Sequence, residues 1–389
     1  MKKSLVALAF GTLGLGIAEF VMMGILPDVA HDMNVSIATA GHLISAYALG
    51  VCVGAPLLVL ARKFPLKHIL LVLVGLIMLG NCCAAAAPNY WLLLAARFIS
   101  GLPHGAYFGV GSIVAEKLAD KGKGTEAVAI MVAGMTIANL FGVPLGTFLS
   151  TAISWRVTFL LVGVWGMVIL YSIWRWVPQV EGLPDKGFKG QFRFLKSPAP
   201  WLLIFATMLG NGGVFCWYSY INPLLTHVSG FPAQKISELM VLAGIGMVAG
   251  NLLSGRLSDR FSPGRVAFSV QGVVCVLLVL IFFFAHISWM SVVLMCFCTA
   301  GLFALSSPQQ VLLLRFSKGG ELLGAASAQV AFNLGNAIGA FAGGLPLEAG
   351  LGYHYSALIG APFALVGFVL LLVFYRKYEK PEQLAGQGK

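Results

Sequence analysis

Residues 4–26 read SLVALAFGTLGLGIAEFVMMGIL, an apolar stretch that contains one charged residue, Glu19. The hydrocarbon core of a bilayer is about 30 Å thick, and a helix needs about 20 apolar residues to cross it. The stretch is therefore long enough to form a membrane-spanning helix. Lys2 and Lys3 precede it, as in a signal peptide. Because the apolar run continues to Leu26, we expect a retained spanning helix instead of a cleaved leader.

Runs of the same kind recur along the whole chain, which is 59% hydrophobic and only 10% charged. With the first, they cover about 4–26, 39–61, 68–87, 91–114, 126–150, 155–177, 201–225, 236–257, 265–286, 288–312, 322–346 and 354–376. The sequence therefore predicts an all-α membrane protein with twelve transmembrane helices.

Positive charge is distributed unevenly between these runs. The formal net charge of +11 would also suit a nucleic-acid-binding protein. If the amino terminus is cytoplasmic and each run crosses once, 22 of the 25 Lys and Arg fall on the cytoplasmic side. Arg156 and Lys235 fall outside, and Arg97 lies within a run. This bias follows the positive-inside rule. It predicts two cytoplasmic termini and assigns the charge to membrane topology, with no nucleic-acid partner.

The cysteines and the common catalytic motifs indicate no cofactor chemistry. All seven cysteines lie within the apolar runs, so no disulfide framework is expected. The sequence contains no HExxH motif, no paired CxxC motif and no GxxxxGK[ST] phosphate loop. We therefore expect no metal, no cofactor and no ATP hydrolysis. A polytopic membrane enzyme and a channel are alternatives that no motif favours.

The longest polar stretch, residues 178–200, divides the chain into two sets of six runs. Its prolines and charged residues are typical of a linker. Short matches recur on its two sides: GVCVG at 50–54 with GMVAG at 246–250, and NLFG at 139–142 with NLG at 333–335. The offsets are 196 and 194 positions, which indicates a duplicated unit. The predicted parts are an N-terminal half (1–177), a cytoplasmic linker (178–200), a C-terminal half (201–376) and a cytoplasmic tail (377–389).

Several motifs resemble those of one transporter family. They are the acidic first-helix segment around Glu19, the fourth-helix set Arg97, Gly101 and Gly105, the fifth-helix segment from Gly142 to Gly146, and the loop GRLSDRF at 255–261 with Arg265. Over essentially its whole length the chain is similar to the major facilitator superfamily, in particular to its twelve-helix drug:proton antiporters and arabinose or sugar efflux permeases. The resemblance implies two pseudo-symmetric six-helix halves in a bacterial inner membrane.

Glu19 and Arg97 are the charged residues that lie deep within predicted helices. A charge at the bilayer centre costs roughly 2.5–3.5 kcal/mol on insertion scales, so such residues usually carry function. A rise of about 1.5 Å per residue places the two side chains at similar depths, about 10 Å below the external edge. We expect a proton-coupling pair in which Glu19 changes charge and Arg97 stays protonated. The alternative is a fixed ion pair that only joins two helices.

Other polar and aromatic residues are expected around a central cavity. His104 lies seven residues after Arg97, on about the same helix face, and is predicted either as a second proton site or as a neutral hydrogen-bonding residue. The predicted cavity residues are Tyr107, Phe108, Asn139, Asn211, Trp217, Tyr218, Gln309 and Asn333. Their alternative roles are to join helices through hydrogen bonds or, for Trp and Tyr, to lie at the membrane interface.

Two further sets of residues are expected to take part in conformational change, one as a gate and one as a flexible helix segment. The loop motif implies a cytoplasmic gate formed by Gly255, Asp259, Arg260 and Arg265. In the fifth helix, Gly142, Pro144 and Gly146 are expected to permit flexing, since proline removes a backbone hydrogen bond. Static packing would use the same residues.

Together these features predict a secondary active transporter. We expect it to export small organic molecules, sugars or drug-like compounds, by proton antiport and alternating access. Its partners would be that small molecule, protons and the lipid bilayer, and it would act as a monomer. Uptake by symport and facilitated diffusion on the same fold are the alternatives.

Overall fold

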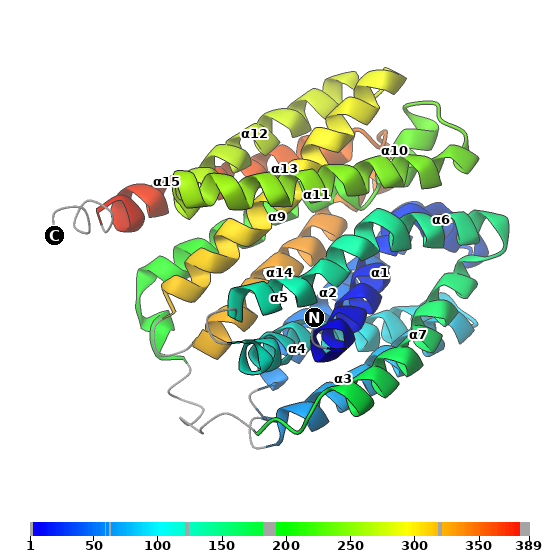
Figure 1. Cartoon of the computed structure of the whole chain (residues 1–389). Helices are drawn as coiled ribbons and strands as arrows, with labels where there is room; N and C mark the ends of the chain where they lie inside the picture. The colour runs from blue at the N-terminus through cyan, green and yellow to red at the C-terminus, as the bar shows by residue number, and fades with distance from the viewer. Residues whose placement is uncertain are drawn as a thin grey trace. The chain divides into compact units, whose positions relative to one another are not determined.

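The computed structural model describes residues 3–58, 60–61, 64–120, 124–181, 192–317 and 321–381 of the chain (Figure 1). These residues form α-helices, short 3-10 helices and π-helical segments, with no strand among them. The predicted all-α class is confirmed.

The helices follow the predicted runs closely. The N-terminal elements are α1 (Lys3–Asp32), α2 (Ile37–Leu57), α3 (Leu66–Ala86), α4 (Tyr90–Leu118), α5 (Gly124–Ile137), the π-helical η1 (Ala138–Gly142), α6 (Val143–Ala152) and α7 (Trp155–Trp176). The later elements are η2 (Arg193–Lys196), α9 (Pro198–Tyr218), α10 (Ile221–His227), η3 (Ala233–Lys235), α11 (Ile236–Arg260), α12 (Pro263–Phe284), α13 (Ser288–Arg315), α14 (Glu321–Glu348), α15 (Tyr355–Phe374) and the π-helical η4 (Tyr375–Glu379).

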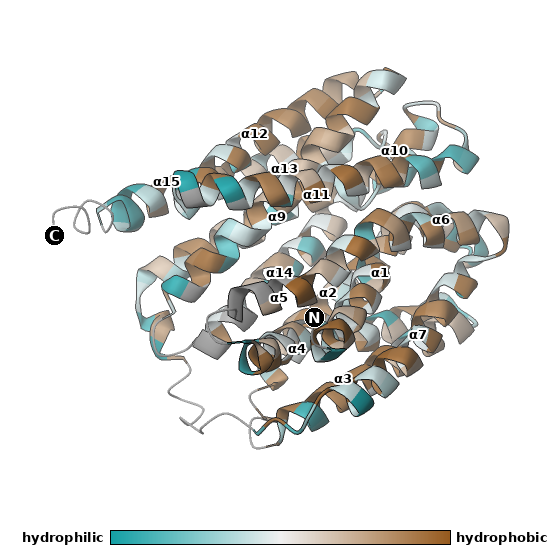
Figure 2. Ribbon diagram, viewed as in Figure 1, coloured by the Kyte–Doolittle hydropathy of each residue, from teal (hydrophilic) through white to brown (hydrophobic). Residues whose placement is uncertain are grey.

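Most of these helices match a membrane in length and composition. Eleven helical stretches among the described residues are long and apolar enough to cross one. The 29-residue helix α4 covers the remaining predicted run at 91–114. Figure 2 shows hydrophobic residues along most of the helices and hydrophilic residues toward many of their ends. Large apolar side chains on these helices, such as Trp174, Val273 and Phe297, are more than half exposed, which suits contact with lipid.

Two predicted helices are interrupted, in each case next to a proline. In the run at 126–150, the π-helical segment η1 separates α5 from α6, and Pro144 is the second residue of α6. In the run at 201–225, α9 ends at Tyr218 and α10 begins at Ile221, two residues before Pro223. Proline has no N–H to donate to the carbonyl four residues earlier, so a regular α-helix cannot continue unchanged through these positions.

The chain divides into two compact units, Met1–Lys186 with Pro232–Val241 and Gly187–Phe231 with Leu242–Lys389. In the first unit, α1 packs on α5 and α7, and α3 packs on α4 and α7. In the second unit, α9 packs on α14 and α15, and α12 packs on α13 and α15. The first spanning helix of each unit thus contacts the fifth and sixth, and the third contacts the fourth and sixth. This repeated pattern fits a duplicated unit. The predicted linker includes residues 182–191, which lie outside the described residues.

Helix α9 approaches its two neighbours through glycine. A Cβ added at Gly339 or Gly343 of α14 would collide with the carbonyl oxygen of Gly212 or Cys216 on α9. A Cβ at Gly360 of α15 would collide with α9 on another side. The backbones of the three helices are therefore in direct contact, as small-xxx-small interfaces allow.

Candidate functional site

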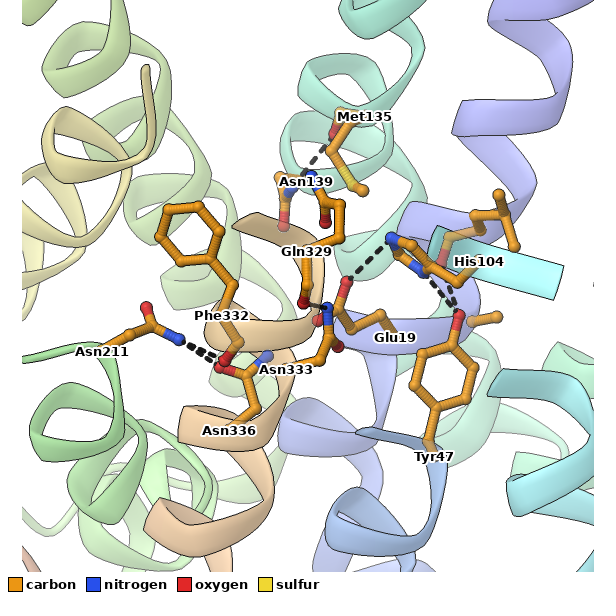
Figure 3. A network of polar contacts seen from close by, with 12 residues as sticks. Glu19, Tyr47, His104, Met135, Asn139, Asn211, Gln329, Phe332, Asn333 and Asn336 are labelled. Carbon is orange, nitrogen blue, oxygen red and sulfur yellow. Dashed lines mark hydrogen bonds and ion pairs between the residues drawn. The ribbon is translucent and has the colours of Figure 1, made fainter. Parts of the chain in front are cut away.

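The centre of the N-terminal unit contains a buried carboxylate paired with a histidine. Glu19 lies in the middle of α1 and its residue is 7% exposed. Its Oε2 lies 3.7 Å from Nε2 of His104 on α4, an ion-pair distance that is too long for a hydrogen bond (Figure 3). The contact is thus an electrostatic pair whenever His104 is protonated.

His104 is held on its other sides by two aromatic residues. Its Nδ1 lies 2.9 Å from the hydroxyl of Tyr47 on α2. Its ring stacks on Phe108, one helical turn further along α4, with 5.2 Å between ring centroids and 14° between ring planes. These contacts fix the ring so that Nε2 faces Glu19.

Arg97 is fully buried on α4 and lies next to the same group. Its Nη1 donates a 2.8 Å hydrogen bond to the carbonyl of Ala18, the residue before Glu19. Its guanidinium carbon lies 4.4 Å from the centroid of the Tyr47 ring and 5.3 Å from that of Phe159. Its Nε and Nη2 have no hydrogen-bond partner. The predicted residues Glu19, Arg97 and His104 are therefore brought together, with His104 facing the carboxylate and Arg97 bound to the adjacent backbone.

Tyr47 is a member of this site that the sequence analysis did not single out. It is 1% exposed and contacts both His104 and Arg97. A tyrosine inside an apolar run carries no charge, so the cost of inserting a charge did not draw attention to it. The available signal was a phenol among the small residues Ala46, Ala48 and Gly50.

Two of the remaining predicted residues of this unit donate hydrogen bonds to backbone carbonyls, and the glycines face side chains of α1. The Tyr107 hydroxyl donates to the carbonyl of Leu8 on α1 at 3.1 Å. Asn139 is nearly buried in η1, and its amide donates to the Met135 carbonyl at 3.0 Å, one turn earlier. Gly142 faces Ile17 of α1 and Gly146 faces Val21 of α1, both in close contact. The predicted flexing residues Gly142, Pro144 and Gly146 thus end or follow the π-helical segment η1.

The centre of the C-terminal unit is made of amides. Asn211 on α9 donates to the carbonyl of Phe332 at 2.9 Å and to the side chain of Asn336, both on α14 (Figure 3). Asn333 donates to the carbonyl of Gln329 at 3.0 Å, and its Oδ1 is buried without a partner.

Two other predicted cavity residues of this unit have buried polar atoms without a partner. Both side-chain polar atoms of Gln309 on α13 and the indole N–H of Trp217 on α9 are in this state. Tyr218 is buried beside Trp217, with 5.8 Å between ring centroids. Buried polar atoms of this kind can bind polar groups of a ligand.

The predicted gate lies around the turn between α11 and α12. Arg260 and Arg265 both place their guanidinium groups over the ring of Phe261, at 5.4 and 5.5 Å from its centroid. A Cβ at Gly255 would meet no atom within 4 Å. The side chain of Asp259 lies outside the described residues.

A carboxylate that sequence analysis assigned to the tail lies beside this turn. Glu379, in η4, is fully buried. It accepts a 3.1 Å hydrogen bond from the N–H of Gly264 and a 3.4 Å bond from the hydroxyl of Ser262. These two residues begin α12, so the negative charge lies at the positive end of a helix. Among the described residues, no group of three or more His, Cys, Asp or Glu could hold a metal ion.

Comparison with known proteins gives close relatives. The chain is 49% identical to the Escherichia coli (strain K12) protein named AraJ over 98% of this chain and 97% of that protein. It is 37% identical to "Inner membrane transport protein YdhP" of the same strain, with 97% of each chain covered. It is 27% identical to a Helicobacter pylori (strain P12) protein named "Probable sugar efflux transporter", over 97% of this chain and 95% of the other.

Solved structures share the fold at low sequence identity. A bacterial homologue of the human lysosomal transporter Spinster, in an inward-facing conformation, matches with a TM-score of 0.74 and 17% identity, covering 97% of each chain. A D-xylose–proton symporter matches with a TM-score of 0.74 and 15% identity, covering 96% of this chain and 97% of the other. The family model of the Major Facilitator Superfamily matches residues 8–329. The chain therefore belongs to the Major Facilitator Superfamily of membrane transporters.

Proposed function

We propose that this chain exports small organic molecules, sugars or drug-like compounds, in exchange for protons by alternating access. The observation that carries the proposal is the pair formed by Glu19 and His104, 3.7 Å apart and buried within membrane-length helices. Carboxyl and imidazole groups both bind and release protons under physiological conditions when their surroundings change. The transporter would be a monomer in a bacterial inner membrane, with both termini cytoplasmic.

The charges of the site provide a reason for coupling. With Glu19 ionised, His104 neutral and Arg97 protonated, the three groups sum to zero charge. One added proton gives the buried site a net positive charge, which is costly in a low-dielectric environment. A cationic substrate would add the same charge, so proton and substrate would disfavour each other. For a neutral sugar, protonation of Glu19 would instead remove an acceptor for a hydroxyl group.

The relatives support export and a polar substrate. One relative carries sugar efflux in its name, and it covers nearly all of this chain. The amides of the C-terminal unit, in particular Gln309 with no partner for either polar atom, are the kind of groups that bind sugar hydroxyls.

Glu19→Gln is the direct test of coupling. Purified protein in proteoliposomes would be assayed with radiolabelled D-xylose and with ethidium as probes of the two substrate classes. We expect an imposed pH gradient to drive transport of one probe by the wild type and not by the variant, while exchange without a gradient persists. The control is Glu238→Gln, which removes an exposed glutamate paired with Lys235 at 2.9 Å. Coupling that survives Glu19→Gln would refute the proposal, and accumulation of the probe on the side that receives protons would assign uptake by symport.

A further inference from the structure

Tyr47 contacts both His104, which can bind a proton, and Arg97, the permanent cation of the N-terminal unit. Its hydroxyl lies 2.9 Å from Nδ1 of His104 and 3.4 Å from the carbonyl of Leu15. The face of its ring lies under the guanidinium of Arg97, at 4.4 Å. The side chain is buried, so these contacts replace water on both sides.

The hydroxyl contacts bear on which nitrogen of neutral His104 carries the proton, because Nδ1 can either accept from the Tyr47 hydroxyl or donate to it. A phenol has one proton to donate, and Nδ1 is the nearer of its two acceptors. When the hydroxyl donates to Nδ1, neutral His104 must hold its own proton on Nε2. That nitrogen faces Oε2 of Glu19 at 3.7 Å. The tautomer that directs an N–H toward the carboxylate is thus the one that Tyr47 selects.

The second acceptor permits the site to accept a proton. When His104 is protonated on both nitrogens, Nδ1–H becomes the donor and the Tyr47 oxygen becomes the acceptor. The phenol proton can then turn to the Leu15 carbonyl, which lies within 3.4 Å. The Tyr47 hydroxyl and Nδ1 of His104 are hydrogen-bonded to each other in both states, and the only proton added is the one on His104.

The contact between the Tyr47 ring and Arg97 adds the permanent cation to this group of side chains. A guanidinium over a tyrosine face is held by attraction to the π electrons. Together with the hydrogen bond to Ala18, this contact keeps the cation beside the segment of α1 that carries Glu19. Because Nε and Nη2 of Arg97 have no partner, the guanidinium has donors available for the carboxylate if the pair with His104 separates.

We propose that Tyr47 is a positioning residue for proton coupling: its hydroxyl selects the tautomer of His104 that faces Glu19, and its ring holds Arg97 beside α1. This inference rests on the proposed function of the Glu19 pair. The titratable and charged groups that the described contacts bring to this point are Glu19 from α1, Tyr47 from α2, and Arg97 and His104 from α4.

Tyr47→Phe separates the two contacts, because it keeps the ring and removes the hydroxyl. The matched control is Tyr90→Phe, which removes a 3.0 Å hydrogen bond between the same two helices, from Tyr90 on α4 to Thr39 on α2. We expect Tyr47→Phe to shift the pH midpoint of gradient-driven probe transport by about one unit and Tyr90→Phe to leave it unchanged. In ¹⁵N spectra of histidine-labelled protein, assigned with His104→Gln, the wild type should show the Nε2–H tautomer and Tyr47→Phe a mixture.

The outcomes separate this inference from the proposed function. If Glu19→Gln loses coupling in the same vesicles while Tyr47→Phe keeps the wild-type midpoint and tautomer, the role of Tyr47 is wrong and the function stands. If Glu19→Gln keeps its coupling, the function itself is wrong. Loss of folding by Tyr47→Phe would show as a lower melting temperature. The ¹⁵N spectrum of wild-type protein still decides the tautomer in that case, and an Nδ1–H signal for His104 would overturn the inference.

Discussion

The two units of this transporter share a helix pairing pattern but have different centres. The N-terminal unit has a carboxylate, a histidine and an arginine around the ring of Tyr47. The C-terminal unit has, among the described residues, amide hydrogen bonds from Asn211 to α14 and glycine contacts of α9 with both neighbours. A duplicated scaffold can therefore keep its backbone arrangement while one copy holds titratable groups and the other holds neutral ones. The comparison predicts that the units respond differently to substitution.

The largest effect is expected from Arg97→Leu. Removing one partner of a buried charged group typically costs about 3–5 kcal/mol, because the remaining charge is left uncompensated. We expect Arg97→Leu to abolish gradient-driven transport and to lower thermal stability sharply, and the double variant Glu19→Gln with Arg97→Leu to recover part of the stability. In the C-terminal unit, the equivalent cycle on Asn211 and Asn336 should give a coupling of only about 0.6 kcal/mol. Equal coupling energies from the two cycles would remove the distinction between the units.

A smaller loss of stability is expected from Gly339→Ala. The added methyl group would meet the carbonyl of Gly212, and overpacking of this kind costs roughly 1–3 kcal/mol. The matched control is Gly75→Ala on α3, where a Cβ meets nothing within 4 Å and alanine should favour the helix. Thermal unfolding in detergent measures both. An unchanged unfolding temperature for Gly339→Ala would mean that α9 and α14 can move apart without loss of stability.

The next effect concerns the carboxylate of the C-terminal unit. Glu379→Ala leaves the Gly264 N–H and the Ser262 hydroxyl without this acceptor, at a cost of about 1–3 kcal/mol. Glu379→Gln keeps an acceptor and should lose less. We expect limited proteolysis near the start of α12 to accelerate in the order wild type, Gln, Ala. The same rate for all three would show that the charge has no role in ordering this turn.

The smallest effect is a pH dependence outside the spanning helices. Burial, and then the nearby His286, lower the pKa of His354, which precedes α15. A lowered pKa favours neutral histidine in the folded state, so the unfolded chain binds more protons at low pH. The contribution of neutral His354 to folding stability therefore remains as pH rises. It diminishes as pH falls below about 6.5, the pKa of histidine in the unfolded chain. His354→Gln should reduce the fall in melting temperature between pH 7 and pH 5 by a small margin. An unchanged fall would exclude His354 as its source.

Much of the fold was predictable because lipid imposes a strict rule on sequence. Helices that cross a bilayer need long apolar runs, and each predicted run is mostly helical in its described residues. A disruption was expected at Pro144 but not at Pro223, and in neither case does the missing hydrogen bond indicate the form that the backbone then takes. A π-helical turn and a two-residue break are both solutions to the same missing donor.

The site was predictable to the extent that charge is expensive in a membrane. Glu19 and Arg97 were identified on that ground, and the structure places both at one point in the first unit. The pairing of Glu19 with His104 depends on side-chain directions that sequence does not contain. Tyr47 carries no charge, and Glu379 lies among the basic residues of the chain's end, so neither was identified on that ground.

The π-helical segment η1 also adjusts the rotational phase of the helix that contains it. Gly134 of α5 and Gly146 of α6 both lie against α1, at Ala9 and Val21 respectively. In an uninterrupted α-helix, twelve residues at about 100° each would leave their directions about 120° apart. A π-helical turn takes up one extra residue, which reduces the difference to about 20°. A single-residue deletion within 138–142 would therefore permit a regular α-helix in which both glycines still face α1, whereas a regular α-helix that kept all twelve residues would turn one of them away.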